Sequence, residues 1–161
     1  MFLNGPKRRI LRAMGEAAMN LDELGKMLNR GDLRVDLFEL EREGLIERSP
    51  TDKNIYRRTR KIELPVFSKK GEAVVYFVES DFYELIKIGY STDLETRFDQ
   101  LQADSPAMLT LLNFVPAGEY DHEWNLHHEF TKYRHHNEWF SASKELILYI
   151  VNLEPMETEI I

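Results

Sequence analysis

The chain has 161 residues, of which 43% are hydrophobic and 30% are charged, and its formal net charge is -7. This composition and a mean hydropathy of -0.44 are typical of globular domains and argue against disordered or membrane-embedded classes. The chain has no cysteine, which excludes disulfide frameworks, thiolate zinc sites and cysteine nucleophiles. No run approaches the roughly 18 apolar residues of a membrane span, so we expect a cytoplasmic protein with no membrane partner.

Charge is distributed unevenly along the chain. Residues 1–70 carry 16 lysines and arginines against 11 acidic residues, a net +5, whereas residues 71–161 carry 5 against 17, a net -12. A basic segment favours contact with a polyanion such as DNA, because phosphate contacts supply most non-specific affinity; a chance distribution of surface charge is the alternative. We therefore predict two domains, residues 1–70 and residues 71–161, in the α+β fold class.

The basic segment is expected to form three helices followed by a hairpin. The first helix would begin near Pro6, which a first helical turn tolerates. Asn20 is placed to cap the second helix, and Asp32 the third, which would end at Gly44. Two short strands would then flank the turn-forming segment 49–54.

This order of elements, with the segments ELEREGLIERS and YRRT, resembles winged-helix transcription regulators. The resemblance implies that the helix Asp32–Glu43 approaches a DNA major groove with its N-terminal end. The acidic residues of the same helix favour the alternative, a winged helix used for protein contacts or as a scaffold. The arginines expected to bind DNA lie near the start of the helix and along the wing: Arg30, Arg34, Arg57, Arg58 and Arg60.

The acidic segment begins with two strand-like stretches, VVYFVES and YELIKIGYS, joined at Ser80–Asp81. Thr92 and Glu95 have the spacing of a capping box at the start of a helix. MLTLLNFV is typical of a third strand, and two further helices are expected at Gly118–Tyr133 and Ser143–Asn152. The order ββαβαα predicts a small three-stranded antiparallel sheet flanked by helices. The final PMETEII is expected to be a frayed tail.

Two short motifs, Val74-Val75-Tyr76 and Lys87-Ile88-Gly89, resemble the signature of the GIY-YIG endonuclease superfamily, in the phage and bacterial branch whose second motif reads KIG. Arg97 lies eight residues after Gly89, which is the spacing of the family's active-site arginine. Glu123, in EWNLHHEF, matches the acidic residue that holds the metal. The segment Asn137–Phe140, NEWF, matches a further signature of the branch.

The resemblance implies metal-dependent hydrolysis of phosphodiester bonds. This reaction needs an activated water, stabilisation of charge on the phosphate, and a cation or acid for the leaving oxygen. By this resemblance, Tyr76 would orient or deprotonate the water, and Arg97 would stabilise the negative charge on the phosphate. Glu123 would bind one Mg²⁺ or Mn²⁺ ion. A phenol with an ordinary pKa of about 10 is a poor base at neutral pH, so Tyr76 would need a nearby cation, for which Lys87 and the metal are candidates.

The sequence departs from the superfamily pattern at three positions. Lys87 stands in place of the second-motif tyrosine, which leaves the role of this position open. Val74 stands in place of the first-motif glycine, where glycine mostly eases strand packing. The asparagine that commonly closes the site has no secure counterpart, and Asn137 is the nearest candidate.

All five histidines lie between His122 and His136. The string H-E-x-x-x-H-H lacks the spacing of a zinc-binding HExxH pair, which excludes a zincin-type protease. His127 is four residues after Glu123 and would share its helix face. There it could contact phosphate, transfer a proton or orient the carboxylate, and packing or capping is the alternative. His127 therefore joins the catalytic candidates.

The preferred hypothesis is a metal-dependent DNA endonuclease, in which the basic winged helix positions duplex DNA and the acidic domain cuts it. Two alternatives stay open. One is a non-catalytic DNA-binding regulator that uses the nuclease fold for dimerisation or partner binding. The other is a phage or mobile-element factor that acts on a host protein complex. A homodimer is an option, because cutting two strands with one small site usually calls for two copies.

Overall fold

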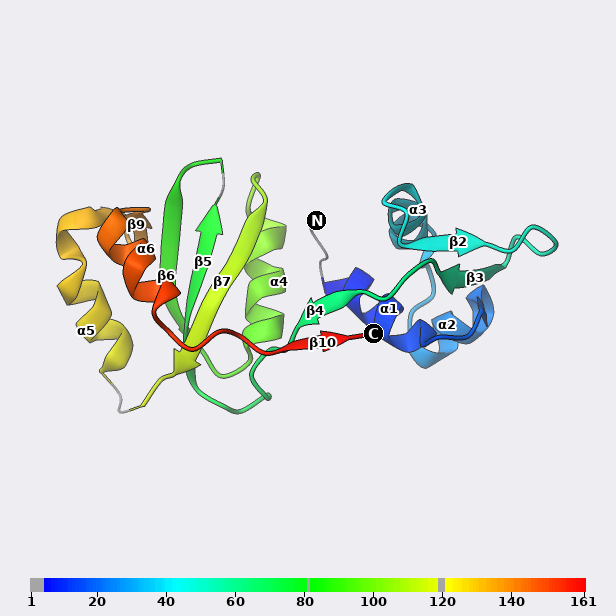
Figure 1. Cartoon of the computed structure of the whole chain (residues 1–161), viewed down its shortest axis with the longest axis horizontal. Coiled ribbons are helices and arrows are strands. Elements are labelled where there is room, and N and C mark those ends of the chain that lie inside the picture. Colours follow the sequence, from blue (N-terminus) through cyan, green and yellow to red (C-terminus); the bar gives the residue numbers. More distant parts are fainter. Residues whose placement is uncertain (1–4, 81, 119–120) are drawn as a thin grey trace. The chain divides into compact units, whose positions relative to one another are not determined.

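The computed structural model describes residues 5–80, 82–118 and 121–161. The chain divides into two compact units, an N-terminal unit of residues 5–65 with Thr158–Ile161 and a C-terminal unit of Val66–Glu157. Both units combine helices with antiparallel strands (Figure 1), which confirms the α+β fold class. Within the described ranges, no helix has both the length and the apolar character needed to cross a membrane.

Among the described residues, the N-terminal unit contains three helices and a three-stranded sheet of order β1-β3-β2. The predicted order of three helices and a hairpin is confirmed, and one short additional strand, β1, pairs with β3. Leucines and isoleucines from all three helices fill one core. The elements are α1 (Gly5–Met14), β1 (Met19–Asn20), α2 (Leu21–Met27), α3 (Arg34–Arg42), β2 (Ile46–Arg48) and β3 (Ile55–Arg58).

Capping residues set the helix boundaries in this unit. Asn20 caps α2 as predicted: its side chain accepts a hydrogen bond from the Asp22 amide, and Glu23 completes a capping box. The predicted Asp32 cap of α3 is wrong, because the N-cap residue is Leu33, which makes no side-chain cap bond. Asp32 instead accepts a hydrogen bond from the Arg34 amide at 3.0 Å.

The end of the chain belongs to the N-terminal unit. Strand β10 (Thr158–Ile160) pairs antiparallel with β4 (Glu63–Pro65), as Figure 1 shows. The side chain of Ile161 packs against the core of this unit, and Glu159 forms an ion pair with Arg12 at 2.5 Å. The predicted frayed tail is therefore wrong, because ladder bonds and apolar contacts offset the entropy lost when the segment is ordered.

Within its described residues, the C-terminal unit has a five-stranded antiparallel sheet of order β7-β5-β6-β9-β8. The three predicted strands are confirmed, and two three-residue strands, β8 and β9, extend the sheet beyond the prediction. Such short strands carry too few residues for an alternating pattern to be recognised. The elements are β5 (Val74–Ser80), β6 (Leu85–Ser91), α4 (Leu94–Asp104), β7 (Leu109–Pro116), α5 (His122–Glu129), η1 (Thr131–Tyr133), β8 (Arg134–His136), β9 (Trp139–Ser141) and α6 (Lys144–Val151).

Side chains of the interior strand β5 alternate between the two faces of this sheet. Val75 and Phe77 belong to an apolar cluster with residues of α5 and α6, whereas Tyr76 belongs to a cluster with Leu94 and Phe98 of α4. Figure 1 shows α4 on one side of the sheet and α5 and α6 on the other. Because both faces are covered, the strand reads as a continuous apolar run rather than an alternating one.

Two predicted helix boundaries of this unit need correction. Asp93, not Thr92, caps α4, and its carboxylate accepts a hydrogen bond from the Thr96 amide at 3.2 Å. The helix expected over residues 118–133 is the shorter α5 followed by the 3-10 turn η1, and part of its expected start lies outside the described residues. The cap of the last helix is confirmed, because Ser143 accepts a hydrogen bond from the Leu146 amide at 3.2 Å.

Candidate active site

Tyr76 and Arg97 are in direct contact. Tyr76 is buried in the middle of β5, and Nε of Arg97, from α4, donates a hydrogen bond to its hydroxyl at 3.3 Å. Burial raises the pKa of the Tyr76 hydroxyl, although the hydrogen bond from Arg97 acts in the opposite direction. The same hydrogen bond raises the pKa of Arg97. The pair therefore presents a neutral phenol beside a permanent positive charge.

The glycine of the KIG motif makes room for this tyrosine. Gly89 lies directly opposite Tyr76 in the β5–β6 ladder. A Cβ atom at position 89 would lie 2.9 Å from Cε2 of the Tyr76 ring and closer still to Cζ and Oη. Non-bonded carbon atoms pack at about 3.5–4.0 Å, so no side chain fits here while the ring keeps its place. The position requires glycine because any larger residue would overlap the Tyr76 ring.

Lys87 lies two residues before Gly89 on β6, with only 8% of its side chain exposed. Its ammonium group forms an ion pair with the carboxylate of Glu138. The same nitrogen lies 5.8 Å from the centre of the Trp139 ring, which is within cation–π range. Glu138 was not among the residues predicted for the site, although it lies inside the NEWF segment.

Glu123 and His127 share one face of α5, as their spacing predicts. Nε2 of His127 lies 3.8 Å from Oε1 of Glu123 and 2.9 Å from the carbonyl oxygen of Ile88 on β6. A carbonyl oxygen can only accept a hydrogen bond, so Nε2 of His127 carries a proton. The His127 ring also packs 5.2 Å from the ring of Phe140. The histidine thus links α5 to the strand that carries the KIG motif.

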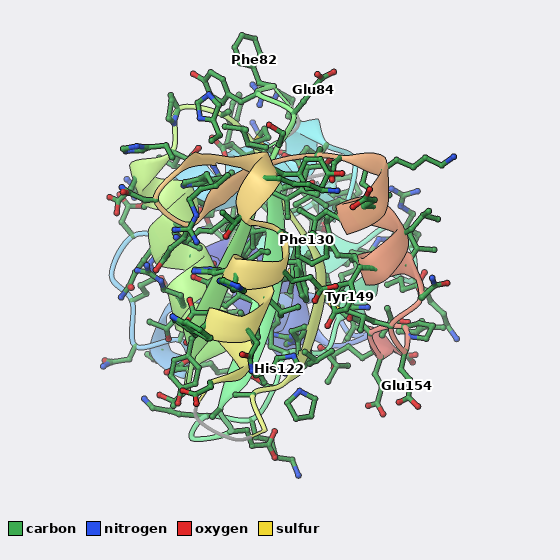
Figure 2. The ribbon with its side chains drawn as sticks, turned by 90° about the vertical axis from the view of Figure 1, so that its left-hand side faces the viewer. Phe82, Glu84, His122, Phe130, Tyr149 and Glu154 are labelled. Carbon is green, nitrogen blue, oxygen red and sulfur yellow. The ribbon has the colours of Figure 1, made fainter. Side chains whose placement is uncertain are left out.

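Aromatic contacts at its C-terminal end hold α5 against the sheet. Phe130, the C-cap residue of α5, lies 5.6 Å from Tyr149 of α6, and Tyr149 lies 5.9 Å from Phe77 of β5, all measured between ring centres. Figure 2 shows Phe130 and Tyr149 side by side between the two helices, with His122 at the other end of α5. This anchoring fixes where Glu123 and His127 lie relative to the strands.

The charged groups of the two helices and the sheet act on one another. Burial raises the pKa of the Glu123 carboxyl; Glu138 acts in the same direction, whereas His127 and Lys87 oppose it. The charges of Glu138 and Glu123 also act on the Tyr76 hydroxyl and add to the rise in its pKa. The structure thus places the predicted residues in two contacting pairs, Tyr76 with Arg97 and Glu123 with His127, and the charge of Glu138 acts on both Tyr76 and Glu123.

A cavity of about 650 Å³ has Lys87, His127 and Glu138 in its wall, whereas Tyr76, Arg97 and Glu123 do not line it. Arg134, from β8, also lines it. Its guanidinium group donates a hydrogen bond to the His127 carbonyl oxygen at 3.3 Å and lies 5.2 Å from the Phe140 ring centre. The side chains of Lys87 and Arg134 thus line this space together with the carboxylate of Glu138, so its wall carries charges of both signs.

Glu123 has the donor chemistry that a hard divalent cation needs. Its side chain is 27% exposed, so one carboxylate oxygen can reach a hydrated ion. Mg²⁺ usually keeps several waters and binds through one or two carboxylates together with substrate phosphates, and one partly exposed carboxylate fits that requirement. Within the described ranges, no three histidine, aspartate or glutamate side chains cluster as a complete metal cage.

The arginines predicted to bind DNA fall into two groups in the N-terminal unit. Arg34 and Arg60 are exposed. The other three have partners within the unit: Arg30 pairs with Asp36 at 2.6 Å, Arg57 pairs with Glu47 at 2.5 Å, and Arg58 donates to the carbonyl oxygen of Gly15. On the wing, the carboxylate of Glu47 thus offsets the charge of Arg57, whereas Arg58 keeps its charge and has its position fixed by a carbonyl oxygen.

Comparison with known proteins identifies one family. Residues 73–153 match the T5orf172 domain family, and this range contains Tyr76, Lys87, Arg97 and both candidate residues of α5. Neither the curated proteins nor the solved structures yield a match. Because the family covers just over half of its residues, the chain belongs to the T5orf172 domain family.

Proposed function

We propose that the T5orf172 domain of this chain is a nuclease domain of the GIY-YIG type, which hydrolyses phosphodiester bonds in DNA. The observation that carries the proposal is the hydrogen bond from Arg97 to the Tyr76 hydroxyl. The Tyr76 ring occupies space that a side chain at position 89 would fill. The carboxylate of Glu123 acts electrostatically on Tyr76. A phenol, a guanidinium group and a carboxylate from three elements are the groups that the sequence resemblance assigns to this reaction.

The environment of each group supports a division of tasks. Arg97 is placed to stabilise negative charge that develops on the phosphate. The raised pKa of Tyr76 favours a role in which its hydroxyl orients the attacking water by hydrogen bonding, rather than one in which a phenolate removes the proton. Glu123 would hold one Mg²⁺ or Mn²⁺ ion, which supplies Lewis-acid stabilisation of the phosphate and the leaving oxygen.

The N-terminal unit has a proposed role in positioning duplex DNA, as a winged helix. Its order of three helices and a hairpin supports this role, and so does the exposure of Arg34 at the start of α3 and of Arg60 after β3. The acidic C-terminal segment, with its net charge of -12, would approach DNA against electrostatic repulsion. A basic unit on the same chain offsets that repulsion.

The test is nicking of supercoiled plasmid in Mg²⁺ or Mn²⁺ by the full chain and two matched variants. Glu123→Ala should lower the nicking rate about 100-fold or more, the size of loss seen when one charge-stabilising group is removed. Glu129→Ala, an exposed position on the same helix, should leave the rate unchanged. If the wild type cuts none of a panel of duplex, branched and single-stranded DNA with either metal, the proposal is wrong.

A second candidate function, binding of a protein partner by the N-terminal unit, has one specific observation in its favour. Val35 and Phe38 on α3 are 67% and 56% exposed. Large apolar side chains together on a surface are typical of protein interaction sites. Under this alternative, Phe38→Ser would abolish capture of a protein partner, and the wild type would show no DNA binding at low salt. DNA binding that depends on Arg34 would favour the first function instead.

A further inference from the structure

Three residues of the NEWF segment, Asn137, Glu138 and Trp139, line the cavity at the candidate active site. The segment forms the turn from β8 into β9 and the first part of β9, next to the strand that carries the KIG motif. The inference drawn from it rests on the proposed nuclease function and concerns which residue of the segment supports that function.

The backbone of this segment fixes the position of Glu138. Asn137 adopts a left-handed conformation with φ of 50°, which asparagine tolerates better than most residues. The next residue, Glu138, accepts a hydrogen bond from the Ile88 amide through its carbonyl oxygen at 3.1 Å. The carbonyl oxygen of Ile88 in turn receives the hydrogen bond of His127. The glutamate is therefore held to β6 by its main chain, independently of its side chain.

The last two residues of the segment support the neighbouring site residues. Trp139 lies opposite Lys87 in the β6–β9 ladder, with its ring near the ammonium group. Phe140 is fully buried and packs against the His127 ring. The aromatic residues thus provide fixed surfaces, while the glutamate provides the only charged side chain of the segment.

A lysine side chain is flexible, so its charge has a defined position only when a partner holds it. Fixing such a side chain costs rotamer entropy, and a buried ammonium group without a partner is strongly disfavoured. The carboxylate of Glu138 forms an ion pair with Lys87, and it comes from a backbone that is already fixed. The pair lies in the wall of the cavity, beside the groups on α5.

We propose that Glu138 is a positioning residue of the nuclease site, which acts by holding the ammonium group of Lys87 in the cavity wall. In this role, the carboxylate of Glu138 would bind Lys87 and would contact neither the scissile phosphate nor the metal. Its side chain is 44% exposed, so water can hydrate it when Lys87 is removed. Loss of Glu138, by contrast, leaves the buried lysine without its carboxylate. This asymmetry is what makes the two residues separable by mutation.

The experiment is a double-mutant cycle on plasmid nicking by the full chain, with wild type, Glu138→Gln, Lys87→Met and the double variant. Glu138→Gln should lower kcat about tenfold, as supporting residues of metal sites commonly do. The KM for DNA and the Mg²⁺ concentration at half-maximal rate should stay unchanged. In the Lys87→Met background the same substitution should have no further effect, because a residue that acts through another loses its effect when the other is absent.

Two more variants serve as controls. Glu145→Gln removes a different carboxylate–lysine pair of the same unit, with Lys132, in which both side chains are about 60% exposed, and it should leave kcat unchanged. Glu138→Asp keeps the charge and should recover part of the lost rate. Thermal unfolding of each variant shows whether a lower rate results from loss of the folded state. If Glu138→Gln does not fold, the rate of Glu138→Asp tests the proposal instead.

Three results would overturn the positioning role while leaving the nuclease function intact. The first is a Glu138→Gln variant with the wild-type rate. The second is a further tenfold loss in the Lys87→Met background, which would mean that Glu138 acts independently. The third is a shift in the Mg²⁺ requirement, which would make Glu138 a metal ligand. A wild-type chain that cuts no DNA would overturn the nuclease function and, with it, this role.

Discussion

The two units each bury a lysine, and they do so in different ways. Lys7 of α1 pairs with two carboxylates of α3, Glu39 at 2.8 Å and Glu43 at 3.0 Å. Lys87 of β6 pairs with one carboxylate, Glu138, and lies near an aromatic ring. The first pair joins two helices that no backbone ladder connects. The second joins two strands that already share backbone hydrogen bonds.

The comparison indicates that Lys7 stabilises the packing of two helices, whereas Lys87 belongs to the candidate active site. At Lys7, both partners come from the same helix face, so the ion pairs fix how α1 lies on α3. At Lys87, the strands are held without the ion pair, and the ammonium group lies in the wall of a cavity. Its charge acts on Glu123 and opposes the effect of burial on that carboxyl. Mutations should therefore affect stability in one unit and cleavage in the other.

The largest expected effect comes from Gly89→Ala in the C-terminal unit. The new methyl group would displace the Tyr76 ring. Overpacking of this kind costs about 1–3 kcal/mol of stability, and misplacement of a reacting group by about 1 Å can cost about 100-fold in rate. Nicking assays and hydrogen exchange should show both losses, with exchange in α1–α3 unaffected. A variant that folds and cuts like the wild type would show that the ring does not need this space.

Lys7→Met should produce the opposite pattern. Removing the lysine leaves Glu39 and Glu43 without it, and we expect a loss of about 2 kcal/mol, below the 3–5 kcal/mol of fully buried pairs because Glu39 is 37% exposed. The rate of cleavage per folded molecule should be unchanged. Hydrogen exchange of α1 and α3 together with nicking measures both quantities. If Lys7→Met lowered kcat while stability held, the distinction between the two lysines would be lost.

The smallest expected effect is a difference in acid sensitivity between wild type and Lys7→Met. The hydrogen bond from Lys7 holds the pKa of Glu39 below its ordinary value. A carboxyl with a lowered pKa in the folded state contributes stability above its ordinary pKa and loses it as the pH falls through the lowered value. Wild-type helices α1 and α3 should therefore lose protection on acidification more steeply than those of Lys7→Met. Parallel pH profiles would contradict this origin of the stability.

Local signals in the sequence were sufficient for the long elements and for part of the site. The three long strands, the cap at Asn20 and the shared helix face of Glu123 and His127 follow from patterns within a few residues. Tyr76 and Arg97, which are in contact, lie 21 residues apart in sequence. Their proximity was inferred from a family resemblance rather than from local periodicity. The structure supports that grouping by geometry.

Elements that depend on distant partners could not be predicted in this way. Strands β8 and β9 have three residues each; β9 forms against the edge of β6, and β8 pairs in turn with β9. Strand β10 forms because β4, far earlier in the chain, provides a ladder. Nothing in the sequence around Glu138 distinguishes it from the other acidic residues. Its ion pair is with Lys87, which lies 51 residues away in sequence. The sequence of a short segment contains too little information to predict which distant segment it will contact.

The sequence by itself determined the fold class, the division of charge between the two halves, and the candidate residues with motif-like spacing, because composition and periodicity are properties of neighbouring residues. Tertiary structure decided why Gly89 must lack a side chain, which carboxylate holds Lys87, and that the last residues complete the N-terminal unit. Each of these depends on how close two distant segments come in space, and that distance is set only when the chain packs.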